Sequence, residues 1–387
     1  MCRLILVSII FGVLTCIAGS EPAVVTVRQS DLMITPAAID QATTTKVPVS
    51  GWGRVTLKDL SLTEAVLESI EAHLSATKDV HIIHCDNGNE FSERLQKMPA
   101  LLRLRMVRTD VDVLAHPQLR QLIISESRRV PRLVLPELRL LAVNASASLI
   151  DQLEGISELE FLSDVHLARC DLSAGVLLHL MALPNLRSLS LSGSTIKGIH
   201  SLEGVEFSEL ERLDLSQTII GRYPLGLKTP NLKSLILSGS NLKVGSLADI
   251  PSMPLLEELG ISEIDLSDMR QSDLDELLLK FPLLSSLGVG KSQMSLELLQ
   301  EIFRRESITI LGAQDLALTT GQFIAIVEKA GRIPPRLGLM NNALDDGIIP
   351  ILLRFQGQVT LNLDGNPISQ EGQKALRDGL KDVRLNF

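Results

Sequence analysis

The sequence predicts an α/β solenoid, a stack of short repeats in which each repeat contributes one strand to a parallel sheet. The first observation is a recurring phrase, apolar-x-apolar-x-x-small/polar-x-apolar, found for example at Leu189–Ile196, Leu235–Leu242 and Leu361–Ile368. Its spacing of about 20–29 residues is typical of solenoids with one strand per turn. The second observation is composition. Hydrophobic residues make up 45% of the chain but aromatic residues only 3%, which fits an aliphatic core shared between neighbouring repeats.

The phrase begins fifteen times, and we call its first residue the lead residue. The lead residues are Val55, Val80, Leu104, Leu122, Leu141, Val165, Leu189, Leu213, Leu235, Leu259, Leu287, Thr309, Leu337, Leu361 and Val383. In each unit the residue two positions later is also apolar. Because side chains alternate between the two faces of a strand, these two residues are predicted to face the core, and the residues on either side of the lead residue to face outward.

Nine consecutive units add an apolar residue three positions before the lead residue: Leu101, Leu119, Leu138, Leu162, Leu186, Leu210, Leu232, Leu256 and Leu284. The extended pattern, Leu-x-x-Leu-x-Leu-x-x-[Ser/Thr/Cys/Asn]-x-Leu, resembles that of the leucine-rich repeat superfamily. The resemblance implies a horseshoe-shaped solenoid with a concave parallel β-sheet and convex helices or turns. The middle of the chain resembles the irregular repeats of exported bacterial proteins. The C-terminal third, including Leu337–Gly347, is similar to the ribonuclease-inhibitor-like subclass.

The position five residues after the lead residue is mostly short and polar, for example Thr109, Ser194 and Asn342. Such side chains can satisfy backbone groups where the chain turns out of the sheet. Cys85 and Cys170 occupy the same position, four strands apart. At ~4.8 Å per strand their separation would be nearly 20 Å, whereas a disulfide needs Cα atoms within about 7 Å. Both are therefore predicted to be free, buried thiols.

The spacing between lead residues predicts where helices fit. The steps from Leu104 to Leu122 and on to Leu141 are 18 and 19 residues long, which leaves no room for a full helix. The steps after Leu259 and Thr309 are 28 residues long and leave enough. Helical apolar spacing occurs at 270–281, 295–305, 319–330, 346–354 and 370–379. Thr319-x-x-Gln322 predicts a capping box at the start of the third of these helices.

Residues 1–20 have the pattern of a secretory signal peptide: a basic start at Met1–Arg3, an apolar run at Leu4–Ile17 and small residues at Ala18–Ser20. The apolar run is shorter than the ~20 residues of a membrane-spanning helix. We expect an exported protein of the periplasm, the cell envelope or the exterior, with membrane attachment only if this segment is kept as an uncleaved anchor. Residues 21–50 have no strong periodicity and are interpreted as an N-terminal flank. The repeat domain is placed at 51–387.

Composition and motifs argue against several classes of function. A net charge of −9 disfavours nucleic-acid binding through a basic surface. Gly288–Ser292 resembles the end of a phosphate-binding loop, but it lies on the repeat phrase and is predicted to form a strand. In His81–Cys85 the first histidine faces outward and the cysteine inward, so a shared metal site is not expected. We predict no enzyme activity, no cofactor and no metal.

The remaining candidate is the outward face of the sheet, which we expect to be concave. Its candidate ligand-binding residues are His81, Arg103, Arg105, Asp164, His166, Arg212 and Asp214. A solvated charged face is the simpler interpretation, because the face has arginines but none of the aromatic residues that commonly anchor interfaces. The expected function is a non-enzymatic interaction or scaffold protein that binds a protein or a glycan. The alternative is self-assembly into a homo-oligomer through the edge of the last predicted strand, Val383–Phe387.

Overall fold

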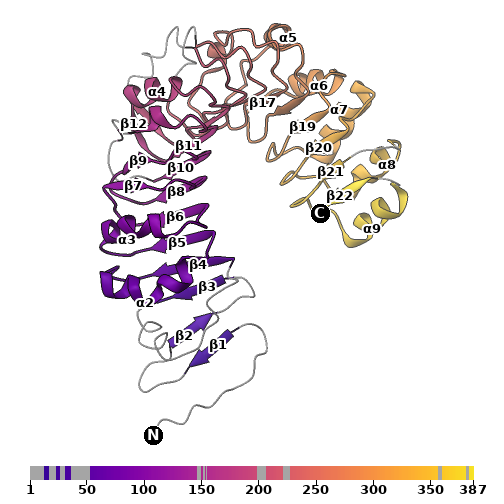
Figure 1. Ribbon diagram of the computed structural model, residues 1–387. Helices are drawn as coiled ribbons and strands as arrows, with labels where there is room; N and C mark the ends of the chain where they lie inside the picture. The colour runs from indigo at the N-terminus through magenta and orange to yellow at the C-terminus, as the bar shows by residue number, and fades with distance from the viewer. Residues whose placement is uncertain are drawn as a thin grey trace. The chain divides into compact units, whose positions relative to one another are not determined.

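The computed structural model describes residues 13–16, 23–26, 31–35, 53–145, 150, 153, 155–197, 206–220, 227–355, 360–380 and 383–387. The chain forms two compact units, Met1–Leu186 and Arg187–Phe387 (Figure 1). Within the predicted signal segment only β1 (Val13–Cys16) is described, and it pairs antiparallel with β2 (Ala23–Thr26). The rest of residues 1–20 lies outside the described residues, so the signal peptide stays a prediction.

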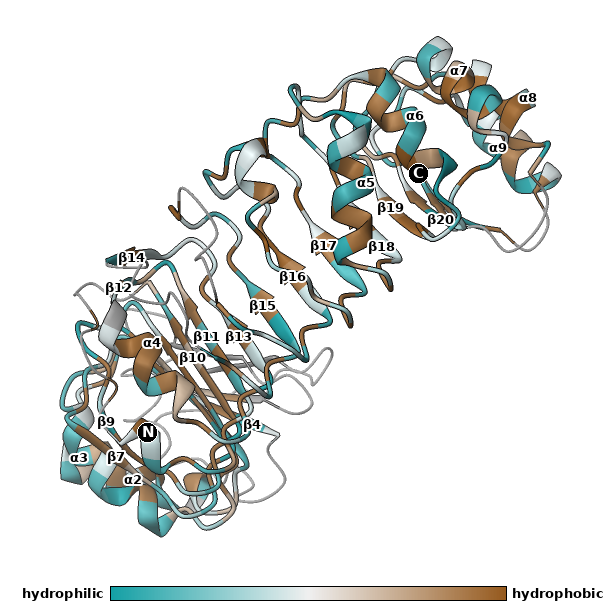
Figure 2. Ribbon diagram, turned by 90° about the horizontal axis from the view of Figure 1, so that it is seen from above, coloured by the Kyte–Doolittle hydropathy of each residue, from teal (hydrophilic) through white to brown (hydrophobic). Residues whose placement is uncertain are grey.

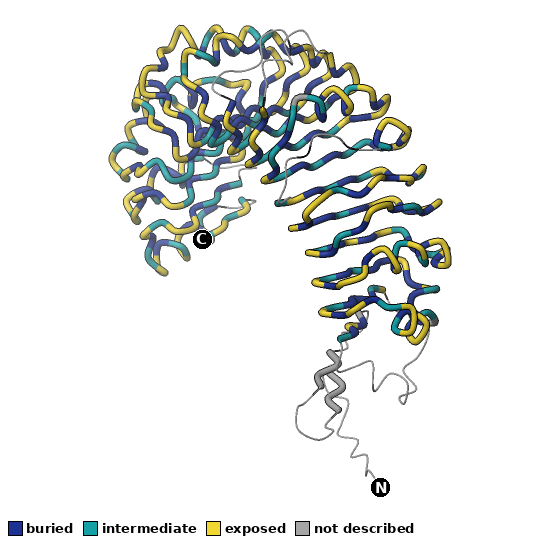
Figure 3. Tube along the Cα trace, turned by 90° about the vertical axis from the view of Figure 1, so that its left-hand side faces the viewer, coloured by how far each residue is buried: buried dark blue, intermediate teal, exposed yellow. Residues whose placement is uncertain are grey.

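The sheet of the first unit consists of seven parallel strands in chain order: β3 (Asp31–Ile34), β4 (Arg54–Lys58), β5 (Asp79–Ile83), β6 (Arg103–Val107), β8 (Gln121–Ser125), β10 (Leu140–Asn144) and β11 (Asp164–Ala168). The lead residues pair with one another across the sheet, as in Leu104 with Leu122. From β4 to β11 the lead residue and the residue two positions later are buried in every strand, which confirms that these side chains face the core (Figure 3).

Strand β3 was not expected from the sequence, because it lies in the segment interpreted as a flank. Its register on β4 pairs Leu32 with Val55 and Ile34 with Leu57. Leu32 and Ile34 are buried, whereas Met33 between them is exposed. The sequence continues with a small residue at Ala37 and an apolar residue at Ile39, so it matches the repeat phrase with Leu32 as lead residue. The sheet therefore begins one strand earlier than the fifteen predicted units.

The far side of this sheet is covered by α2 (Glu64–Leu74), α3 (Gly88–Arg94), η1 (Leu95–Lys97), β7 (Val113–Ala115), β9 (Arg132–Val134), η2 (Ile156–Glu158), β12 (Asp171–Ser173) and α4 (Ala174–Met181) (Figure 1). In the two short repeats β7 and β9 replace helices and pair in parallel. An extended strand needs fewer residues than a helix to return to the sheet, which explains how these repeats manage with 18 and 19 residues.

The second unit contributes nine parallel strands to its sheet: β13 (Ser188–Ser190), β15 (Arg212–Asp214), β16 (Ser234–Ile236), β17 (Glu258–Gly260), β18 (Ser286–Gly288), β19 (Ile310–Gly312), β20 (Arg336–Gly338), β21 (Thr360–Asn362) and β22 (Arg384–Asn386). A further strand, β14 (Thr195–Lys197), lies outside this sheet. The remaining elements are η4 (Val244–Leu247), α5 (Gln271–Lys280), α6 (Leu296–Arg304), α7 (Thr320–Ala330), η5 (Asp346–Ile348), α8 (Ile349–Leu352) and α9 (Gln370–Gly379). These helices carry hydrophobic residues toward the core and hydrophilic residues elsewhere (Figure 2). The predicted α/β solenoid is confirmed.

Two of the fifteen predicted lead residues are wrong by two positions. Leu287 pairs with Leu311, not Thr309, and Leu361 pairs with Leu385, not Val383. A slip of two residues keeps every side chain on its expected face, so alternation alone does not detect it. Before β19, the buried Ile308 lies three positions ahead of Leu311. It is the apolar residue that the extended pattern requires when Leu311 is the lead residue.

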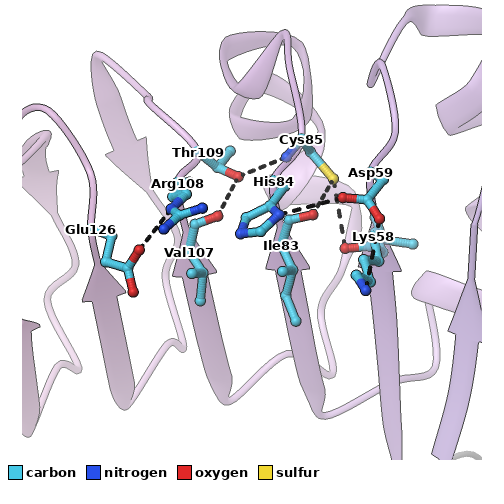
Figure 4. A network of polar contacts seen from close by, with 10 residues as sticks. Lys58, Asp59, Ile83, His84, Cys85, Val107, Arg108, Thr109 and Glu126 are labelled. Carbon is cyan, nitrogen blue, oxygen red and sulfur yellow. Dashed lines mark hydrogen bonds and ion pairs between the residues drawn. The ribbon is translucent and has the colours of Figure 1, made fainter.

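Each repeat leaves the sheet through a residue with positive φ, four positions after the lead residue. These residues are Asp59, His84, Arg108, Glu126, Ala145 and Arg169 in the first unit, and Gly193, Gln217, Gly239, Glu263, Lys291, Asp315, Asn341 and Gly365 in the second. Two pairs of neighbours in this row approach each other: His84 Nδ1 lies 3.4 Å from Asp59 Oδ1, and Arg108 Nε lies 2.6 Å from Glu126 Oε2 (Figure 4). The row lines one edge of each sheet with exposed polar groups.

The side chain of the following residue, five positions after the lead residue, points back into the core. Cys85 and Cys170 occupy this position in their repeats and are free and buried, as predicted. The Cys85 thiol donates to the carbonyl oxygens of Ile83 (3.4 Å) and Leu57 (3.6 Å), and its backbone N–H donates to Thr109 Oγ1 (Figure 4). Burial raises the pKa of the Cys85 thiol. The cysteine therefore acts here as a small core residue in a polar ladder rather than as a nucleophile.

A candidate interaction surface on the open face of the sheet

The open face of each sheet is the face turned away from the helices (Figure 1). It carries the residues immediately before and after each lead residue. On β4, β5 and β6 these residues are Arg54, Thr56, Asp79, His81, Arg103 and Arg105. Parallel register places Arg54 beside Asp79 and Asp79 beside Arg103 in one row, and His81 beside Arg105 in the next. On these three strands three arginines stand against one carboxylate, on a chain of net charge −9, and Asp31 of β3 lies beside Arg54 in the register.

Asp79 organises this cluster from a buried position. Asp79 is only 4% exposed, because its side chain lies between the longer side chains of the two flanking strands. Oδ2 accepts a hydrogen bond from Arg54 Nε at 3.1 Å and lies 3.5 Å from an Arg103 Nη2. Oδ1 lies 3.4 Å from His81 Nε2. Both carboxylate oxygens are thus engaged by side chains of three adjacent strands.

Arg105 stands apart from this network. It is exposed and lies between His81 and Ile123 in the register of β5, β6 and β8. Within the described part of the chain its guanidinium has no ion-pair or hydrogen-bond partner. Its planar donors are therefore available to a carboxylate or a phosphate from outside the molecule.

The structure thus brings together His81, Arg103 and Arg105 of the predicted site residues. Asp164 and His166 face the same side from β11, but β8 and β10 lie between, at a distance of about 14 Å for three strand spacings. Asp164 accepts a hydrogen bond from Ser163 Oγ at 2.6 Å. These two residues do not join the arginine cluster.

Arg212 and Asp214 belong to the second unit, where both lie on the open face of β15. Asp214 accepts hydrogen bonds from Ser190 Oγ and from the Ser216 backbone, both at 2.9 Å. Arg212 is exposed. Beside it, a hydrogen bond from Lys233 lowers the pKa of Glu211. Farther along this face Gly260, Gly288, Gly312 and Gly338 follow one another in register, which leaves a stripe without side chains.

Asp79 and Arg54 were absent from the predicted site residues. The alternation of side chains puts both on the open face, but it does not show that two arginines and a histidine converge on one carboxylate. A usable signal did exist. The position before the lead residue reads Arg, Asp, Arg in three successive units, at 54, 79 and 103, and opposite charges on directly adjacent strands interact.

The described residues contain no group of three or more His, Cys, Asp and Glu side chains placed to hold a metal ion. Among the helices in the described ranges, none has the length and apolar character needed to cross a membrane. The segment that resembles a phosphate-binding loop begins as the last residue of strand β18, Gly288. Ser292 is buried, and its hydroxyl donates a hydrogen bond to the Ile261 carbonyl oxygen at 3.1 Å. That segment is therefore part of the repeat ladder.

Comparison with known proteins gives structural likeness only. No protein family and no curated protein sequence matches the chain. An internalin from Listeria monocytogenes is 14% identical, with 90% of this chain and 92% of that chain covered and a TM-score of 0.41. A leucine-rich repeat protein of Leptospira interrogans is 16% identical, with 91% and 98% covered and a TM-score of 0.42. TLR13 in complex with an RNA is 15% identical, with 92% and 57% covered and a TM-score of 0.49.

The deciding observation is the chain's own repeat. One phrase recurs in strand after strand, and its leucines pair in register through both sheets. The protein has the leucine-rich repeat fold. The likeness to the bacterial irregular repeats and to the ribonuclease-inhibitor-like subclass stays a prediction.

Proposed function

We propose that the protein is a non-enzymatic interaction scaffold whose open sheet face binds a protein partner. The observation that carries this proposal is the cluster on β4–β6, where arginines converge at the surface of an acidic chain. Arginine is enriched at interface hot spots, and charge complementarity speeds association and selects partners. The core does not need these side chains, since the lead residues beneath them are fully apolar.

Charge reversal tests the proposal. The double variant R103E/R105E is expected to abolish partner capture from an extract of the producing cells, while R132E retains it. Arg132 is the matched control because it is exposed on β9, on the far side of the same unit. Equal capture of the partner by both variants would show that the open face is not the binding surface.

Export is the second part of the proposal, and it rests on the sequence pattern of Met1–Ser20. N-terminal sequencing of the protein isolated from its natural source should begin at or near Glu21. A mature protein that begins at Met1 or Cys2 would instead favour retention of the segment or the absence of export.

Self-association through the last strand stays a prediction. Strand β22 pairs with β21, and Leu385 is only half-buried whereas the lead residues of the other strands are buried. Light scattering after size-exclusion chromatography decides the question. A monomer at high micromolar concentration would discard self-assembly and leave the interaction scaffold untouched.

A further inference from the structure

We propose that the far side of the second unit's sheet binds a positively charged amphipathic segment of a partner protein. The surface is formed by η4, α5 and the turns beside them (Figure 1). One large apolar side chain of the segment enters a cleft between η4 and α5, and its Lys or Arg residues face the acids around that cleft. The inference goes beyond the proposed function, which concerns the open face, and does not depend on it.

The cleft lies between two neighbouring repeats. Val244, Leu247 and Ala248 line it from one side, Met269 and Leu277 line it from the other, and its volume is about 130 Å³. A cavity of ~150 Å³ holds a group the size of benzene, so the cleft has room for the end of a Leu, Met or Phe side chain. Its origin is a difference in length: η4 is a turn of four residues, whereas α5 has ten. The turn therefore covers only part of the flank of the helix.

The polar groups of the cleft leave it open to a cationic segment. Lys280 lines one end, but its Nζ donates to the Ala248 carbonyl oxygen at 2.5 Å and lies 3.1 Å from Glu276 Oε1. Asp273 also lines the cleft and accepts a hydrogen bond from the Arg270 backbone N–H at 2.8 Å. Among the described residues, no Lys, Arg or His side chain forms an ion pair with Asp273. The lining cation is thus engaged within the protein, while this carboxylate has no counter-ion.

Exposed leucines continue the apolar surface at the C-terminal end of α5. Leu279 is 81% exposed, Leu283 is 52% exposed and Leu255 is 38% exposed. The turn that carries Leu255 contacts this end of the helix, because the Met253 backbone N–H donates to the Lys280 carbonyl oxygen at 3.1 Å. Single leucines on a surface need no explanation, but three of them beside an apolar cleft indicate a contact surface.

Charge decides which kind of segment fits this surface. From Lys243 to Glu306 the sequence contains twelve Asp and Glu but only six Lys and Arg. Four of these six cations form ion pairs with acids of the same stretch. The flanking stretches 206–242 and 307–355 each contain four acids and four Lys or Arg, so they do not offset the excess. Negative charge attracts a cationic segment and repels an acidic one or an anionic lipid surface.

Fluorescence anisotropy on the full chain tests the surface. The probe is a short labelled peptide with Leu and Phe at the apolar positions of a helical pattern and Lys at the polar ones. One control probe has Glu in place of Lys, and a second has Ser in place of Leu and Phe. We expect saturable binding of the first probe only, weakened by added salt because exposed charges are screened.

The variant G245L tests the cleft. Gly245 lines it, is exposed, and a Cβ added there meets nothing within 4 Å, so a leucine fills the space that the apolar side chain of the probe would take. Binding should weaken about tenfold, as expected when one apolar anchor is excluded. The matched control is G321L, which adds the same side chain at an equally open glycine of α7 and should bind like the unmodified protein.

Circular dichroism and the melting temperature show whether G245L is folded. Should it be unfolded, L279S is the substitute: it removes an exposed side chain that the core does not need, and we expect binding to weaken about threefold. Charge has its own pair of variants. Asp249 is exposed next to the η4 side of the cleft, and Asp378 is exposed on α9. D249N should weaken binding about twofold and D378N should not change it.

Several results would overturn the inference. Equal binding of the Lys and Glu probes, or equal binding of the Lys probe and the probe with Ser, would each do so. Equal affinities of G245L and G321L, or of D249N and D378N, would also contradict it. Light scattering that shows an oligomer dissociated by G245L would make a second copy the occupant instead. Binding to anionic lipid vesicles that G245L abolishes would make it a membrane. The capture experiment with R103E/R105E tests the open face separately, so failure of one experiment leaves the other conclusion intact.

Discussion

Asn342 shows how a single residue joins two repeats. Its Oδ1 accepts hydrogen bonds from the backbone N–H groups of Leu316 and Leu318, both at 3.0 Å. Its amide nitrogen donates to the carbonyl oxygens of Ala313 and Leu339, also at 3.0 Å. The residue is only 6% exposed, so no water replaces these bonds. Serine, threonine or cysteine at the equivalent position of other repeats makes fewer of them.

Replacing Asn342 should therefore be costly. N342A leaves several buried backbone groups without partners, and we expect the free energy of unfolding to fall by about 3 kcal/mol. The adjacent Asn341 is the control: it is exposed with φ of 53°, a conformation that glycine adopts readily. N341G should change stability by less than about 1 kcal/mol. Chemical denaturation followed by circular dichroism measures both, and similar values would contradict the role of the ladder.

His116 gives stability a pH dependence. It is 2% exposed, its Nε2 lies 3.0 Å from the Met98 carbonyl oxygen, and its Nδ1 accepts from the Gln118 backbone at 3.1 Å. Burial lowers its pKa below the ordinary 6.5, and burial also lowers the pKa of His73. Below pH 6.5 the unfolded chain then binds protons that the folded chain does not, so stability is complete above this pH and is lost as the pH falls.

We therefore predict that the free energy of unfolding falls between pH 7 and pH 5. In H116Q it should fall less steeply with pH, because only His73 of the two buried histidines still titrates. Denaturation curves at several pH values provide the slopes. An identical slope in H116Q and the unmodified protein would show that His116 titrates normally in the folded state.

At the level of single residues, the sequence predicted the direction of side chains better than their partners. Parity alone placed His81, Arg103 and Arg105 on one face, and the two buried thiols in the core. It did not single out Asp79, because an isolated outward aspartate resembles any solvated carboxylate until Arg54, His81 and Arg103 are seen around it. Contacts between repeats depend on register in three dimensions.

Among the elements, helix α7 shows a local signal that the structure bears out. Thr319 and Gln322 form the predicted capping box: Thr319 Oγ1 accepts from the Gln322 backbone N–H at 3.4 Å, and Gln322 Oε1 accepts from the Thr319 backbone N–H at 2.9 Å. All five predicted helical segments of the second unit contain helix at or within their bounds. Such signals are local in the chain, which is why sequence alone captures them.

Two substitutions in α7 should shift stability in opposite directions. T319A removes the cap and should lower the free energy of unfolding by about 1 kcal/mol. G321A should raise it by about 0.5 kcal/mol, because Gly321 is helical and exposed and a Cβ added there meets nothing within 4 Å. Thermal melts of both variants provide the test, and a shift in the same direction would contradict the helix assignment.

The elements that the sequence missed depend on tertiary contacts. Strand β3 begins the repeat phrase with Ala37 in place of a short polar residue, and its pairing with β4 identifies it as a strand of the sheet. Strands β7 and β9 each gain a partner only because their repeats are neighbours. The slips at Leu311 and Leu385 preserved parity, so the hydrogen-bonded ladder rather than the apolar pattern decides the register.

For the molecule as a whole, the repeat explains both the fold and the shortage of catalytic signals. Its phrase fixes which residues are buried, and the apparent motifs at Gly288–Ser292 and Cys85 are positions within it. What the repeat leaves free is the open face. The interaction function is therefore a question of which residues touch a partner, and position-specific crosslinking addresses it most directly.

The decisive measurement is photo-crosslinking from one open-face position and one far-side position of the same unit. A photoreactive amino acid replaces Gln121, exposed on β8, or Val134, exposed on β9. If the open face is the interaction surface, the Gln121 probe should capture a defined partner band that disappears in the R103E/R105E background, and the Val134 probe should capture none. Capture from Val134 alone, or from both positions alike, would contradict the claim that the open face is the interaction surface.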